Sequence, residues 1–115
     1  MESILTSVKK LLGIAEDYTQ FDVDIIMHIN ATFMTLNQLG IGPEEGFSIM
    51  SNVETWDSYL GEITNLEAVK SYMALKVRLL FDPPASSAHV DAIKRQVDEY
   101  EFRLLTQIEH LNEEE

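Results

Sequence analysis

The chain of 115 residues contains no cysteine, and no lysine or arginine occurs between Leu11 and Val69. The absence of cysteine excludes a disulfide framework, thiolate metal sites and cysteine nucleophiles. No apolar run approaches the roughly 20 residues that a membrane-spanning helix needs. The first residues lack the basic-then-apolar order of a secretory signal. These absences predict an intracellular protein that does not enter a membrane.

The length and composition predict one folded domain. Hydrophobic residues make up 45% of the chain and charged residues 24%, as in ordinary soluble proteins. A chain of this size can bury one continuous core and has no room for a second domain. We therefore expect a single helical domain over residues 1–112, followed at 113–115 by an acidic, frayed tail.

The charge is strongly acidic and unevenly distributed. Eight basic and twenty acidic residues give a net charge of −12, which disfavours binding to nucleic acid through neutralised phosphates. Ten of the acids lie in the segment from Leu11 to Val69 that has no base, whereas six bases balance six acids from Lys70 to Leu111. Solubility alone explains any one of these acids. A segment of half the chain without lysine or arginine, however, indicates an acidic surface that has a function.

Helical periodicity dominates the sequence and predicts an all-α fold. Apolar residues recur at helical spacing over residues 3–12, 22–39, 65–81 and 87–111. Gly13, Gly40 and Pro83 are the expected stops of the first three helices. A short helical turn is expected from Trp56 to Leu60, ended by Gly61. The prediction is a small bundle of about four helices with a long final helix and one long loop at 41–56.

Capping and amphipathicity give further expectations about these helices. We expect Asp22 to cap the second helix, and Ser86 or Ser87 to cap the last one. The helix at 65–81 has two apolar faces, which is typical of a central helix packed on both sides. Phe102 is the exception on the last helix, since it places an aromatic ring on the charged, outward face.

The loop at 41–56 is the main candidate for an interaction site. Loops of this length in small domains usually bind a partner or pack on a neighbour. We expect Phe47 and Ile49 to be exposed at its tip, with Trp56 at its end as a further interface candidate.

Two asparagines on the preceding helix raise the same question. Asn30 and Asn37 lie one heptad apart at the margin of the apolar face, where a polar side chain needs a partner. They either contact another subunit or are satisfied locally within the domain. Both, like Phe102, are interface candidates.

No arrangement of residues predicts catalysis. His28, His89 and His110 include no pair at the spacing that would hold one metal ion, and Asp24 with His28 is the nearest approach to a site. A glycine-rich phosphate loop and a nucleophile elbow are both absent. We predict no enzymatic activity, no cofactor and no bound metal.

The order of motifs resembles the head-to-tail connector proteins of long-tailed bacteriophages, also called adaptor or head-completion proteins. The similarity rests on the motif Val8-Lys9-Lys10-Leu11-Leu12-Gly13-Ile14, an acidic stretch, a buried helix ending at Leu39-Gly40, a loop, and Glu67-Ala68-Val69 opening another helix. It covers roughly residues 5–81. The resemblance implies a small helical bundle without catalytic residues.

The resemblance also implies a role and partners. Such a protein forms a ring, expected to be twelve-fold, below the portal protein, although the subunit alone can stay monomeric. The ring extends the DNA channel without binding DNA specifically and docks the next head-completion or tail protein. The implied location is the head–tail interface of the virion, with assembly in the host cytoplasm.

The acidic half has two interpretations. In a connector, acidic walls repel phosphates and let DNA slide, so that Glu44 and Glu45 are candidates for the channel lining. The alternative is a small acidic regulatory module of phage or plasmid origin that mimics the charge of DNA and occupies a basic partner. That module would be a monomer or dimer with a continuous acidic face.

Overall fold

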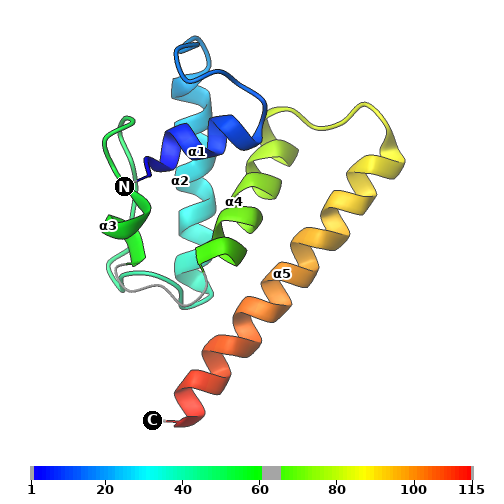
Figure 1. Ribbon diagram of the computed structural model, residues 1–115. Coiled ribbons are helices and arrows are strands. Elements are labelled where there is room, and N and C mark those ends of the chain that lie inside the picture. Colours follow the sequence, from blue (N-terminus) through cyan, green and yellow to red (C-terminus); the bar gives the residue numbers. More distant parts are fainter. Residues whose placement is uncertain (1, 61–65, 115) are drawn as a thin grey trace.

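The computed structural model describes residues 2–60 and 66–114, and it shows five helices (Figure 1). They are α1 (Ile4–Leu11), α2 (Asp22–Gln38), α3 (Trp56–Leu60), α4 (Leu66–Phe81) and α5 (Ser87–Glu114). The predicted all-α fold is confirmed, since the described residues contain no strand beyond one isolated bridge between Ser3 and Thr55. The expected turn at 56–60 is α3, and its expected stop, Gly61, lies outside the described residues.

The predicted glycine stops are confirmed by the backbone. Gly13 and Gly40 have φ angles of +81° and +90°, the left-handed conformation that ends a helix and favours glycine. The cap of α5 is Ser86, whose hydroxyl accepts a hydrogen bond from the amide of His89 at 3.5 Å. This helix continues through Glu114, beyond its predicted end at 111, so residues 113 and 114 are helical.

The expected cap of α2 is wrong. Phe21 occupies the N-cap position and makes no side-chain hydrogen bond there, while Asp22 is the first helical residue. The Asp22 carboxylate instead pairs with Lys9, at 2.9 Å between Oδ1 and Nζ. The buried ammonium attracts this carboxylate, and an acidic side chain in the first turn of a helix also interacts favourably with the helix dipole.

The central position predicted for the helix at 65–81, which is α4, is confirmed. α4 packs against α2 and α5, and also touches α1. Val69, Tyr72 and Met73 are fully buried on it. The hydroxyl of Tyr72 donates to the Glu101 carboxylate of α5 at 2.6 Å, and burial together with that hydrogen bond raises the pKa of Tyr72. The long last helix, α5, therefore packs against α4, as Figure 1 shows.

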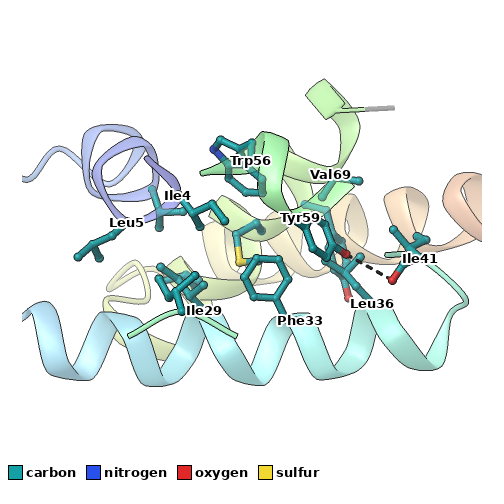
Figure 2. Close-up of a cluster of buried hydrophobic side chains, with 14 of the residues drawn as sticks. Ile4, Leu5, Ile29, Phe33, Leu36, Ile41, Trp56, Tyr59 and Val69 are labelled. Atoms are coloured by element: carbon teal, nitrogen blue, oxygen red, sulfur yellow. Dashed lines mark hydrogen bonds between the residues drawn. The ribbon is translucent and has the colours of Figure 1, made fainter. Parts of the chain in front are cut away.

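All five helices contribute side chains to one hydrophobic core. Figure 2 shows Ile29, Phe33 and Leu36 of α2 directed towards α1, α3 and α4. Trp56 is 2% exposed, and its indole nitrogen donates to the Ser7 hydroxyl at 2.7 Å. A buried indole N–H needs such an acceptor, so this bond fixes α3 against α1.

A fully enclosed lysine connects α1 to the start of α2. Lys9 is 2% exposed, and its ammonium donates to the carbonyl oxygens of Glu16 and Tyr18 at 3.0 and 2.8 Å and pairs with Asp22. Two hydrogen bonds and one ion pair thus compensate the buried charge. The segment between α1 and α2 is therefore folded around Lys9.

Replacing Lys9 should destabilise the protein. We expect Lys9→Met to lower the free energy of unfolding by about 2–3 kcal/mol, because two carbonyls lose their donor and a partly buried carboxylate loses its counter-charge. Urea unfolding measures the change. Lys10→Met is the matched control, since Lys10 is exposed, and it should change the free energy by less than about 0.5 kcal/mol. Equal effects of the two substitutions would contradict this account of Lys9.

Candidate interaction surfaces

The long loop after α2 is fastened to that helix by two asparagine side chains. The Asn30 amide donates to the carbonyl of Ile49 at 3.0 Å and accepts from the Ile49 amide at 2.8 Å. The Asn37 amide donates to the carbonyls of Pro43 and Glu44 at 3.0 and 3.3 Å. Of the two interpretations, local satisfaction accounts for both asparagines, and a contact with another subunit stays a prediction.

The expectation that Phe47 and Ile49 are exposed is wrong. Ile49 is 2% exposed, because the paired bonds from Asn30 hold its backbone against α2 and direct its side chain into the core. Phe47 is partly buried, with its ring centroid 5.2 Å from those of Phe33 and Tyr59. Trp56 is buried as well. Within the chain, these three residues therefore pack the loop against the hydrophobic core and do not form its exposed tip.

The apolar tip of the loop consists of other residues. Met50 and Val53 are 86% and 76% exposed. The Glu54 carboxylate accepts from the amides of Met50 and Ser51 at 2.7 and 3.3 Å. Desolvation opposes ionisation of Glu54, but these backbone hydrogen bonds outweigh it and lower its pKa. Glu54 thus shapes the turn that presents Met50 and Val53 to solvent.

A second apolar surface lies on α2. Val23, Met27 and Met34 are exposed, and their spacing of four and seven residues places them on one side of the helix. We call these three residues the α2 outer face. No Asp, Glu, Lys or Arg occurs from Ile25 to Gln38, although an exposed helix face is ordinarily charged or polar. Unbranched methionine side chains adapt readily to a contacting surface.

The α2 outer face is a candidate interaction surface that was not predicted from the sequence. The absence of charge over residues 25–38 was the available signal. It shows in the sequence, but only the fold shows that Met27 and Met34 lie outside the core.

The remaining candidates lie at the surface. Glu44 and Glu45 are exposed in a turn closed by the hydrogen bond from the Gly46 amide to the Pro43 carbonyl, at 2.9 Å. Phe102 is 69% exposed on α5, as expected. These positions are compatible with contacts to other molecules, and the roles assigned to them stay predictions.

The described residues offer no assembled site for metal chemistry. Within 2–60 and 66–114 no three His, Asp or Glu side chains gather closely enough to hold a metal ion. Over the same residues no helix combines the length and apolarity that crossing a membrane requires. The expected lack of enzymatic activity stays a prediction.

Comparison with known proteins identifies a family. The family model described as phage connector protein matches residues 4–110, from the first residue of α1 to near the end of α5. No curated protein and no solved structure matches the chain. The match covers far more of the chain than the segment at 5–81 on which the resemblance rested.

The packing of the long loop against Tyr59 can be tested by substituting two glycines of the loop. Gly42 and Gly46 both have positive φ angles, but a Cβ on Gly42 would lie 2.6 Å from Cε1 of Tyr59, whereas one on Gly46 would meet open space. Backbone strain should cost Gly46→Ala about 1 kcal/mol. The added clash should cost Gly42→Ala about 1–3 kcal/mol more.

Thermal or urea unfolding of both variants measures this difference. The hydroxyl of Tyr59 donates to the carbonyl of Ile41 at 3.4 Å, and burial raises the pKa of this tyrosine. The ring therefore has little room to move away from residue 42. Equal stability of the two alanine variants would show that the loop does not pack on Tyr59 as described.

Proposed function

The chain belongs to the phage connector protein family, and we propose that it acts as one subunit of a ring at the head–tail junction of the virion. Membership makes it a structural component of the phage particle. In our proposal the ring lies below the portal protein, continues the DNA channel and docks the next head-completion or tail protein. A twelve-fold ring would match the order expected of the portal.

The observation that carries the proposal is the uncovered, uncharged α2 outer face together with Met50 and Val53. Copies with a net charge of −12 repel one another, and this repulsion is least where the contacting surfaces carry no carboxylates. Exposed apolar surface on a small acidic protein is typical of an interface that is covered after assembly. We therefore place a contact with a neighbouring subunit or connector component here.

A ring also requires two different surfaces on each subunit. In a head-to-tail ring, a patch on one copy contacts a different patch on the next. Phe102 and Leu105 are exposed on α5, and α4 lies between α5 and α2 (Figure 1). These two residues and the α2 outer face thus lie on helices separated by the central one, which suits a head-to-tail contact.

The acidic segment between Leu11 and Val69 also has a role in this proposal. Ten acids without a base, repeated around a ring, form a strong negative field. Such a field is tolerated where it repels DNA phosphates from the channel wall, or where a basic surface of the portal covers it. Glu44 and Glu45 are our candidates for the wall, since both are exposed.

The rival function is an acidic regulatory module that mimics DNA. It accounts for the net charge equally well. It gives no reason for an exposed, uncharged helix face, and the match to the connector family over residues 4–110 favours the structural role. We keep the connector as the proposal.

Polar substitutions on the α2 outer face should impair assembly. We expect Met27→Gln with Met34→Gln to reduce infectious particles about tenfold or more, the effect of losing central apolar contacts of an interface. Urea unfolding of the isolated chain should be unchanged, because both side chains are exposed. Leu80→Gln, at another half-exposed position, is the control. A normal titre for the double variant would refute the interface.

Charge reversal of the loop acids tests the channel wall. Glu44→Lys with Glu45→Lys should slow DNA packaging or ejection and lower the titre about tenfold, because lysines bind passing phosphates. Loss of portal binding with normal passage would place these acids at the portal instead.

A matched control keeps the change in charge the same. Glu16→Lys with Asp17→Lys reverses two exposed acids in the segment before α2, at the other end of that helix (Figure 1). This variant should leave DNA passage unchanged. Normal assembly, packaging and ejection with reversed Glu44 and Glu45 would show that they serve solubility alone.

A further inference from the structure

An aromatic groove lies beside the first turns of α2, whereas the long loop begins at the other end of that helix. It has a volume of about 770 Å³ and is formed by the segment between α1 and α2, the first turns of α2 and the end of α4. Its apolar walls are Ile14, Tyr18, Phe21 and Phe81. The rings follow one another, with centroids 5.7 Å apart for Tyr18 and Phe21 and 5.4 Å apart for Phe21 and Phe81. A groove of this size admits one or two side chains of a partner.

The charge around this groove has one sign. Asp24 and Asp82 belong to its lining, both are exposed, and the lining includes no lysine or arginine. His28 completes the wall, with its ring 6.4 Å from that of Phe81. Lys9 of α1 is buried, and its ammonium donates to the carbonyls of Glu16 and Tyr18 and forms an ion pair with the Asp22 carboxylate. Its charge is thus already compensated within the chain.

We propose that this groove binds an arginine or lysine side chain, flanked by apolar residues, from a segment of another structural protein of the phage. Aromatic faces attract cations, and two carboxylates at the rim add a direct ion pair. A neutral segment would leave the carboxylates without partners, and a nucleic acid or an acidic segment would be repelled. The identity of the partner as a phage protein rests on the connector role proposed above, whereas binding of the basic side chain does not.

A different protein suits the groove better than a second copy. The exposed bases of this chain on α5, Lys94, Arg95 and Arg103, are accompanied by Asp91, Asp98 and Glu99, and each copy brings a net charge of −12. A basic segment of a partner would meet no such repulsion. The groove is also built before any partner arrives, because the Lys9 ammonium holds the backbone of Tyr18, and binding therefore needs little ordering.

The test uses the full chain and the synthetic peptide acetyl-Gly-Leu-Arg-Leu-Gly-amide, followed by nuclear magnetic resonance. We expect chemical-shift changes confined to Ile14, Tyr18, His28 and Phe81, with millimolar affinity. The same peptide with citrulline, the neutral isostere of arginine, should bind about tenfold more weakly, which corresponds to one charge-assisted contact. The variant Asp24→Asn with Asp82→Asn should weaken the arginine peptide by a similar factor.

Two controls separate this proposal from the others. Glu44→Gln with Glu45→Gln removes the same charge at the far end of α2 and should leave peptide binding unchanged. The variant Met27→Gln with Met34→Gln should bind the peptide normally even if it fails to assemble, so the groove and the connector contact are tested separately.

Several results would overturn the proposal. Equal binding of the citrulline peptide would show an apolar groove without preference for a cation. Absence of binding, or shifts elsewhere, would show that the groove is not the site. Sedimentation that differs between the Asp24→Asn, Asp82→Asn variant and the native chain, without peptide, would show that a second copy occupies the groove.

Discussion

The buried ammonium of Lys9 is the constraint on which one end of the molecule depends. A charge removed from water requires hydrogen-bond acceptors and a counter-charge; here the acceptors are the carbonyls of Glu16 and Tyr18, and the counter-charge is the Asp22 carboxylate. Satisfying it fixes the path of the chain between α1 and α2. That path in turn places Tyr18 and Phe21 beside Phe81 as the wall of the groove.

Neutral amides on the second half of α2 fix the long loop in the same way. Asn30 and Asn37 satisfy backbone groups of the long loop, and Glu54 gathers the amides of its last turn. In both places polar side chains form their hydrogen bonds within the molecule and thereby fix the path of a connecting segment. Apolar side chains such as Met34 and Met50 are left outside. This distribution is typical of a subunit whose surface is completed by other molecules.

The acidity of the chain then limits where those molecules can approach. Like-charged copies meet most easily through surfaces without charge, which the helix from Ile25 to Gln38 provides. A different partner meets the chain most easily where its own bases face carboxylates, as at Asp24 and Asp82. One net charge thus favours two kinds of contact on two parts of α2, as the proposed ring at the head–tail junction would require.

The sequence by itself determined the helices and the family. Periodic apolar residues with Gly13, Gly40 and Pro83 as stops gave helix bounds close to those observed, because these signals are local in the chain. Only the tertiary structure decided that Lys9 and Ile49 are buried and Met27 and Met50 exposed. Burial depends on which segments meet, as when Asn30 holds the backbone of Ile49, and contacts between segments distant along the chain leave no local pattern.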